Sequence, residues 1–206
     1  IKLRNITSSP VPLHDPLAPT NTWRLRDAVD FDFPQGVVLP AGGALLVVSF
    51  DLVADPFTLG HRFVVERAAA RFDEVIVTVV VNPNKQGMFT VDERLDLIAA
   101  SCADLPNVRV DRWRGLLVDY MRNEGVTTML KGLRSSSDFE YEVPMAQMNR
   151  ELADVETLFL WTDPRYAHLS SSLVKEVARL GGDVQPFLPP VVYRAVMAKI
   201  NGELSA

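Results

Sequence analysis

The chain has 206 residues, of which 48% are hydrophobic and 23% are charged, and its formal net charge is −5 at pH 7. This is an ordinary globular composition, and a chain of this length can form one domain of average size with a small appendage. The negative charge gives no indication of a basic nucleic-acid-binding face, although local clusters of Lys and Arg can still hold small anions such as phosphates.

No segment resembles a signal peptide or an apolar span of about 18 residues, so we expect a cytoplasmic protein without a membrane partner. The first residue is Ile1 rather than methionine, which suggests a fragment or a processed product. The single cysteine, Cys102, excludes an internal disulfide framework. It is either a small apolar helix residue or a reactive thiol. Met145 and Met148 are expected to pack in a helix interface.

Residues 1–51 predict short β-strands. They alternate β-prone runs with Pro, Gly, Asn and Asp and show no helical period, which is typical of a β-meander or a β-sandwich. We therefore expect two domains, a β-rich extension over residues 1–43 and a second domain over residues 44–206.

The second domain alternates β-rich runs with amphipathic segments. The expected strands are 44–50, 74–82, 107–110, 127–133 and 155–161, and the helical patterns start near residues 61, 90, 116, 138 and 171. Such alternation predicts right-handed βαβ units. The expected fold class is α/β, a Rossmann-like open parallel sheet of about five strands with an N-terminal β-rich extension.

Several helix ends are indicated by residues close together in the chain. Thr90, followed three residues later by Glu93, matches a capping box, in which each side chain accepts a hydrogen bond from the other residue's backbone N–H. Gly181-Gly182 can end the preceding helix, since glycine readily adopts a left-handed conformation. Pro189-Pro190 fits the first turn of a last helix.

His61 ends the tetrapeptide TLGH at the expected start of a helix. There it stands beside backbone N–H groups and the positive end of the helix dipole, where an anion such as phosphate is favoured. The other interpretation is a histidine that only caps the helix or forms a local hydrogen bond. The tetrapeptide alone leaves both interpretations open.

Three more polar segments follow expected strands. They are NPNK at 82–85, KGLR at 131–134 and PRYAHLSSSLVKEV at 164–177. Each lies at or just beyond the carboxyl end of a strand, where open α/β sheets bind their ligands. The sequence therefore predicts that all these segments converge with His61 on one crevice.

The segments TLGH, NPNKQGMF, GLLVDYMRNEG, KGLRSSSDFEYEVPMAQMNR and SSSLVKEVARLGGDV resemble phosphopantetheine adenylyltransferase over about residues 56–200. The resemblance implies an enzyme that transfers AMP from ATP to 4′-phosphopantetheine with the help of Mg²⁺, giving 3′-dephospho-coenzyme A and pyrophosphate. It also implies a homo-oligomer, a hexamer in the family. Because the attacking phosphate is already ionised at neutral pH, positioning and charge stabilisation must supply the rate.

The resemblance implies a role for each site residue. His61 would donate to the α-phosphate of ATP as negative charge builds up in the transition state. The residues binding 4′-phosphopantetheine would be Ser49, Lys85, Leu117 and Lys131, with Leu117 along the pantetheine arm. Besides His61, the ATP site would consist of Ser49, Phe50, Gly132, Leu133, Arg134, Glu142, Tyr166, Ala167, His168, Leu169, Ser170, Ser171 and Ser172.

Each of these residues also has a purely structural interpretation. Lys85 and Lys131 could be solvated surface charges. Arg134 and Glu142 could form a surface ion pair that contributes under about 1 kcal/mol. Ser170 and the serines after it could serve only as a helix cap.

No protein residue is expected to be a metal ligand. Asp138, Glu140 and Glu142 are close in sequence, but we expect them on different sides of the chain, which disfavours a site with three ligands. His14 and His168 have no Cys or His partners at zinc-binding spacing.

The phosphate loop departs from the family pattern, which reads GSFDPVTxGH or GTFDPxTxGH. This chain has Val48 where Gly is expected, and residues 52–55 lengthen the loop. A second alignment places Asp55-Pro56 on the family's Asp-Pro and leaves Ser49-Phe50 unmatched.

Upstream, IKLRNITSSPVPL, TNTWRLRD and GVVLPAGGALLVVSFD resemble the first half of a lamin-tail-type β-sandwich. The strand at 44–50 would then end that region and also begin the nucleotide-binding sheet.

Three hypotheses about function follow. The chain is an active adenylyltransferase, or a module that binds nucleotide without turnover because loop 48–58 is stretched, or a lamin-tail-like interaction module.

Overall fold

The computed structural model describes short strands between residues 11 and 47, residues 55–81 and residues 87–204. The chain divides into two compact units, residues 1–43 and residues 44–206. The two units are described separately below.

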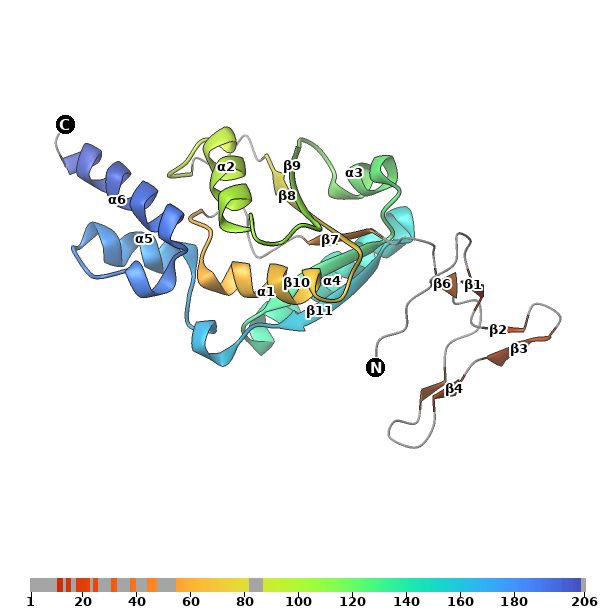
Figure 1. The fold of residues 1–206 in the computed structure, drawn as a ribbon. Helices are drawn as coiled ribbons and strands as arrows, with labels where there is room; N and C mark the ends of the chain where they lie inside the picture. Colours follow the sequence, from red (N-terminus) through yellow and green to blue (C-terminus); the bar gives the residue numbers. More distant parts are fainter. Residues whose placement is uncertain are drawn as a thin grey trace. The chain divides into compact units, whose positions relative to one another are not determined.

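The first unit contains short antiparallel strand pairs (Figure 1). The pairs are β1 (Val11–Pro12) with β6 (Val38–Leu39), β2 (His14–Asp15) with β3 (Ala18–Thr22), and β4 (Arg24–Leu25) with β5 (Phe31–Asp32). The extension is therefore β-rich, as its spacing of β-prone runs and turn residues predicts.

The second unit is built on a five-stranded parallel sheet in the order β11-β10-β7-β8-β9. Its strands are β7 (Ala44–Val47), β8 (Glu74–Val80), β9 (Val108–Trp113), β10 (Thr128–Leu133) and β11 (Glu156–Trp161). Neighbouring strands pair in parallel throughout the sheet. The expected α/β class and open parallel sheet are confirmed.

The helices are α1 (Leu59–Ala69), α2 (Val91–Ser101), α3 (Leu117–Glu124), α4 (Ser136–Ala153), α5 (Ser171–Arg179) and α6 (Pro190–Leu204), with 3₁₀ helices η1 (Pro164–Tyr166) and η2 (Gln185–Phe187). The capping box of Thr90 and Glu93 is present at the start of α2. Gly181 follows α5 with a φ of +81°, and Pro190 opens α6. The expected helix-end signals are thus confirmed. None of the described helices is long and apolar enough to cross a bilayer.

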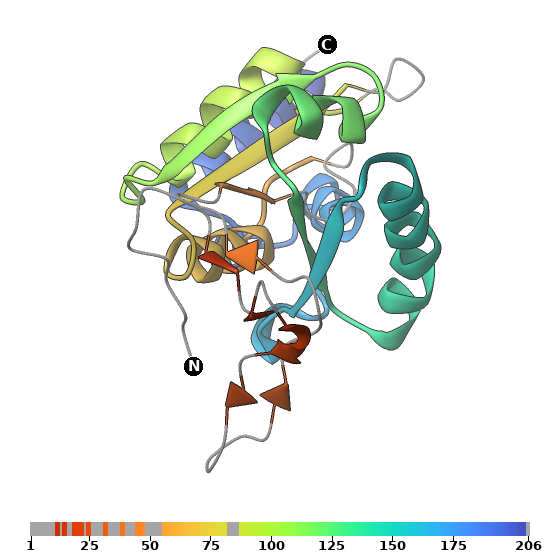
Figure 2. The same ribbon diagram turned by 90° about the vertical axis from the view of Figure 1, so that its right-hand side faces the viewer.

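The two faces of the sheet pack against different helices. Val75, Val77 and Val79 of β8 belong to a core shared with α1, α2, α5 and α6. Ile76 of β8 packs instead with α3 and with Met129 of β10. Successive side chains of a strand point to opposite faces, so β8 is buried on both of them. Figure 2 shows α1 and α4 on opposite sides of the sheet.

The strand order creates a topological switch point at the carboxyl edge of the sheet. From β7 the chain continues outward to β8 and β9, and then returns to the other side of β7 to add β10 and β11. The connections that follow β7 and β10 thus diverge from neighbouring strands, which is where open α/β sheets bind ligands.

The outer surface of α4 is apolar and exposed. Tyr141, Met145, Met148 and Leu152 recur at helical spacing and are 78%, 50%, 56% and 47% exposed. In the single chain the two methionines lie on the solvent side of this helix, and their expected packing in a helix interface stays a prediction.

Candidate active site

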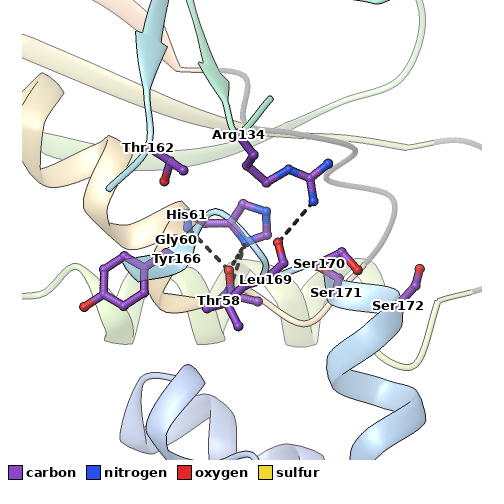
Figure 3. Close-up of a pocket in the computed structure, with 10 residues that line it drawn as sticks. All are labelled: Thr58, Gly60, His61, Arg134, Thr162, Tyr166, Leu169, Ser170, Ser171 and Ser172. Carbon is purple, nitrogen blue, oxygen red and sulfur yellow. Dashed lines mark hydrogen bonds between the residues drawn. The ribbon is translucent and has the colours of Figure 1, made fainter. Parts of the chain in front are cut away.

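A pocket of about 180 Å³ lies at the carboxyl edge of the sheet (Figure 3). Its walls come from the start of α1, the end of β10, the segment after β11 and the start of α5. The lining residues are Thr58, Gly60, His61, Arg134, Thr162, Tyr166, Leu169, Ser170, Ser171 and Ser172. The expected convergence of three segments, after β7, β10 and β11, is therefore confirmed.

The ring of His61 is held by the residue that caps its own helix. The backbone N–H of Thr58 donates to Nδ1 of His61 over 2.9 Å, and the Thr58 hydroxyl accepts from the backbone N–H of His61. Since Nδ1 accepts, the proton of the neutral ring resides on Nε2. The capping and phosphate-donor interpretations of His61 are compatible, because capping uses one ring nitrogen and leaves a proton on the other.

His61 is buried, with 6% of its surface exposed. Burial, assisted by the positive charge of Arg134, lowers the pKa of His61 to about 3. The imidazole is therefore neutral at physiological pH, and it offers an N–H donor rather than a positive charge.

Among the described residues that line the pocket, Arg134 supplies the positive charge. Its guanidinium donates to both carboxylate oxygens of Asp138 and, over 3.1 Å, to the backbone carbonyl of Leu169. Burial opposes ionisation of Asp138, but the hydrogen bonds from Arg134 outweigh burial and hold the pKa of Asp138 below its usual value. Arg134 is thus fixed at the mouth of the pocket between α4 and the segment before α5.

The start of α5 forms the opposite wall of the pocket. Ser170 caps the helix, its hydroxyl accepting from the backbone N–H of Leu173 over 3.1 Å. Ser171 and Ser172 occupy the first turn, where backbone N–H groups have no acceptor within the helix. These groups and the helix dipole favour an anion at this position. Ser170 is therefore a cap, as its structural interpretation requires, on a helix end that faces the pocket.

The structure places only part of the expected ATP set in the pocket. Seven of those residues line it: His61, Arg134, Tyr166, Leu169, Ser170, Ser171 and Ser172. The others that it describes do not line it: Gly132, Leu133, Glu142, Ala167 and His168. His168 is exposed and packs edge-on against Phe187 with ring centroids 5.7 Å apart. Ser49, Phe50 and Lys85 lie outside the described residues.

Lys131 and Glu142 form a nearly buried ion pair with Nζ and Oε2 3.0 Å apart and side chains 13% and 15% exposed. Neither is a solvated surface charge, and the alternative pairing of Arg134 with Glu142 is wrong because Arg134 pairs with Asp138. Asp138 and Glu142 lie on one face of α4 because of their helical spacing. Asp138 pairs with Arg134, just after β10, and Glu142 pairs with Lys131 of β10.

Leu117 lies at the start of α3, partly buried against the core beneath that helix. This position is at the carboxyl end of β9, on the side of β8 away from the pocket just described. The expected substrate residues Leu117 and Lys131 are thus both described, and neither lines the pocket.

Thr58, Gly60 and Thr162 line the pocket without having been assigned to it from the sequence. A Cβ atom on Gly60 would lie 3.4 Å from Cβ of Tyr166, which is ordinary van der Waals contact, so α1 and η1 lie next to each other at this glycine. The Thr162 hydroxyl is buried without a hydrogen-bond partner among the described residues. The tetrapeptide TLGH contains the signal for Thr58 and Gly60, whereas no local pattern marks Thr162.

Within the described part of the chain, no three His, Cys, Asp or Glu residues gather where a metal ion could bind. The described lining residues of the pocket carry hydroxyl groups, an imidazole and a guanidinium. These groups suit an anion.

Comparison with known proteins identifies the family. A model described as cytidylyltransferase-like matches residues 53–177. The phosphopantetheine adenylyltransferase of Corynebacterium diphtheriae is 57% identical over 148 residues, which are 71% of this chain and 93% of that protein. The chain belongs to the phosphopantetheine adenylyltransferase family. The protein of the same name from Corynebacterium glutamicum strain R is also 57% identical, over 150 residues that are 72% of this chain and 94% of that protein.

Solved structures agree on the fold of this phosphopantetheine adenylyltransferase-family chain. A putative nicotinate-nucleotide adenylyltransferase from Vibrio parahaemolyticus superposes with a TM-score of 0.55 at 16% identity and covers 77% of this chain and 94% of its own. The nicotinic acid mononucleotide adenylyltransferase of Plasmodium falciparum, complexed with NaAD, has a TM-score of 0.52 at 10% identity and covers 78% and 96%. At these identities the likeness concerns the fold alone.

The region matched by the family model starts at residue 53, after Ser49 and Phe50. This start favours the alignment that places Asp55-Pro56 on the family's Asp-Pro. The resemblance of residues 1–51 to a lamin-tail-type domain has no support from these matches.

Proposed function

We propose that the chain transfers AMP from ATP to 4′-phosphopantetheine, forming 3′-dephospho-coenzyme A and pyrophosphate in coenzyme A biosynthesis. The relatives that are 57% identical carry the name of this activity. The structural observation that carries the proposal is the pocket in which a neutral imidazole, a guanidinium and a helix N-terminus converge.

In this reaction, the phosphate of 4′-phosphopantetheine attacks the α-phosphorus of ATP and pyrophosphate leaves. His61 donates its Nε2–H to an α-phosphate oxygen as negative charge builds up there. A donor already fixed by Thr58 needs no reorganisation during the step, which is how positioned donors lower a barrier. The low pKa of His61 keeps this donor neutral throughout the physiological range.

Arg134 and the start of α5 hold the β- and γ-phosphates. The guanidinium keeps its orientation through Asp138 and the Leu169 carbonyl, so binding the triphosphate does not require the side chain to be ordered first. Ser171 and Ser172 contribute backbone N–H groups at the helix start.

The second substrate is assigned to Ser49, Lys85, Leu117 and Lys131, as the resemblance implies. Lys85 and Lys131 bind its phosphate, and Leu117 lies along the pantetheine arm. Glu142 forms an ion pair with the Lys131 ammonium over 3.0 Å and so orients this lysine. The assignment of Glu142 to the ATP site rests on the resemblance only.

Magnesium enters as the Mg²⁺ complex of the substrate ATP. The pocket has no carboxylate among its described residues, so the triphosphate oxygens supply most of the ion's ligands. The ion neutralises charge on the phosphates and assists departure of pyrophosphate.

We propose that the chain assembles as a homo-oligomer, the hexamer that the resemblance implies. An assembly is supported by the exposed apolar stripe of α4, which consists of Tyr141, Met145, Met148 and Leu152. An exposed apolar helix face of this kind is typical of an interface. Light scattering of the wild type and of Met148→Lys tests this assignment, with Arg150→Lys as a control outside the stripe.

The cytoplasmic location and the lamin-tail character of residues 1–51 stay proposals from the sequence.

The function is tested by calorimetric titration with Mg-ATP and with 4′-phosphopantetheine, followed by a pyrophosphate-release assay. We expect both ligands to bind and pyrophosphate to appear only when both are present. Binding without release would indicate a nucleotide-binding module instead. Removing the His61 donor in His61→Ala should lower kcat by about 10²-fold or more with little change in ATP affinity.

Two further variants assign the substrates. Lys85→Ala should chiefly weaken 4′-phosphopantetheine, by about 1.5–3 kcal/mol for one charged hydrogen bond, and Arg134→Ala should chiefly weaken ATP. Equal effects of each variant on both ligands would contradict the assignment.

A further inference from the structure

A buried carboxylate lies just before the helix that carries His61. The side chain of Asp55 is 3% exposed, and both of its oxygens are engaged by the loop before α2. Oδ1 accepts from the backbone N–H of Met88 over 2.9 Å, and Oδ2 accepts from that of Phe89 over 3.0 Å. Nε of Arg94, on α2, lies 3.1 Å from Oδ2.

Other described residues pack closely around Asp55. A Cβ atom on Gly87 would lie 2.4 Å from Oδ2 of Asp55 and 2.8 Å from the guanidinium of Arg94. Nζ of Lys175, on α5, is 3.9 Å from Oδ1. Each carboxylate oxygen accepts from a backbone N–H, so the contacts of Asp55 fix the position of backbone.

The three residues after Asp55 connect this anchor to the catalytic ring. The Pro56 carbonyl accepts from the buried hydroxyl of Ser171 over 2.9 Å. Phe57 is buried and stacks on the ring of His61 with centroids 5.6 Å apart and planes at 23°. The backbone N–H of Thr58 then donates to Nδ1 of His61. Residues 55–58 therefore form a turn that is anchored to α2 and α5 and that contacts His61 through Phe57 and Thr58.

We propose that Asp55 is a positioning residue that acts on His61 through the turn 55–58. This inference rests on the proposed function, since it assigns His61 as the donor to the α-phosphate. Asp55 sets the position of the Thr58 N–H, and this N–H sets both the orientation of the imidazole and the location of its proton on Nε2. A misplacement of about 1 Å at a reacting group can cost about 10²-fold in rate.

The test variant is Asp55→Asn, which keeps the shape of the side chain. Its amide has one acceptor oxygen where the carboxylate has two, so either the Met88 or the Phe89 N–H loses its acceptor. Arg94 also loses its negative partner. We expect kcat for pyrophosphate release to fall by at least about tenfold, while the Kd for ATP changes by less than about threefold.

Side-chain ¹⁵N NMR supplies a readout that simple destabilisation would not change. The chain has three histidines, so a His61→Gln spectrum assigns the signals of His61. Wild type should show an unprotonated Nδ1 and a protonated Nε2 at pH 7, and Asp55→Asn should shift the Nδ1 signal as its hydrogen bond weakens. An unchanged kcat, or a lower kcat with unchanged His61 signals, would overturn the proposal.

Two further variants complete the design. Thr90→Ala removes the cap of α2, at a cost of about 1 kcal/mol, without altering the Asp55 contacts, so its kcat should stay within about twofold of wild type. An equal fall of kcat in this control would overturn the positioning role. Arg94→Lys keeps the buried positive charge and tests the positioning role of Asp55 if Asp55→Asn does not fold. We expect this variant to have a several-fold lower kcat and shifted His61 signals. A wild-type kcat with wild-type His61 signals would contradict the positioning role.

Failure of the proposal can be told apart from failure of the proposed function. If wild type releases no pyrophosphate, the function is wrong, and the His61 signals of Asp55→Asn alone then decide whether Asp55 orients the ring.

Discussion

Mild acid should destabilise this protein through one histidine. His61 has an ordinary pKa of 6.5 in the unfolded chain, and burial followed by the charge of Arg134 lowers the pKa to about 3 in the fold. Between these values the unfolded state binds a proton that the folded state does not bind. The stabilising effect of a neutral His61 is therefore present above pH 6.5 and is lost as the pH falls toward 3.

The size of the effect follows from the two pKa values. Each pH unit well inside the interval changes the unfolding free energy by about 1.4 kcal/mol. Between pH 7.5 and pH 4.5, allowing for the partial protonation of free imidazole near its pKa, His61 removes about 2.6 kcal/mol. This is a large fraction of the stability of a typical domain.

Urea unfolding at the two pH values measures this loss, and His61→Gln isolates it. Glutamine does not titrate, whereas carboxylates with lowered pKa, such as Asp138, destabilise wild type and variant alike in acid. We expect wild type to lose about 2.6 kcal/mol more than His61→Gln between pH 7.5 and pH 4.5. Equal losses would mean that His61 binds its proton in the folded state, and the assignment of a neutral donor would then be wrong.

Three other predictions concern packing and reactivity. Gly87→Ala should lower the unfolding free energy by about 1–3 kcal/mol in urea titrations, because its Cβ would overlap Oδ2 of Asp55; wild-type stability would contradict the close approach. Burial raises the pKa of Cys102 to about 11, so the native protein should react with a thiol reagent at pH 8 about 10²-fold more slowly than the unfolded chain, and equal rates would indicate a reactive thiol. Glu142→Gln should lower the unfolding free energy by about 2–3 kcal/mol, since it leaves the Lys131 ammonium nearly buried without a counter-charge; a loss below about 0.5 kcal/mol would place the pair among weak surface pairs.

The sequence by itself determined the elements of the second unit and their order. Alternating β-rich and amphipathic segments predicted the strands and helices, and Thr90 with Glu93 marked a helix start that the structure contains. These signals are reliable because they depend on residues at most a few positions apart, where backbone geometry fixes which side chains meet. Parallel strands joined by helices then bring their carboxyl ends to one edge of the sheet.

The sequence predicted those residues of the candidate site that lie at helix starts or at strand ends. His61, Arg134 and the serines of α5 line one pocket because the fold places their segments at that edge. Their individual roles come from the family resemblance, and Ser49, Phe50 and Lys85 stay predictions.

Only the tertiary structure decided which charged and polar groups meet. The sequence left open a surface pair of Arg134 with Glu142, whereas Arg134 binds Asp138 and Glu142 binds Lys131. Arg134 and Asp138 have the i,i+4 spacing of a helix, but Lys131 on β10 meets Glu142 on α4 only because this helix packs beside the strand. Asp55 similarly reaches a loop 33 residues away, at Met88. Contacts of this kind depend on how distant segments pack, because residues far apart in the chain meet only when the whole sheet and its helices have formed.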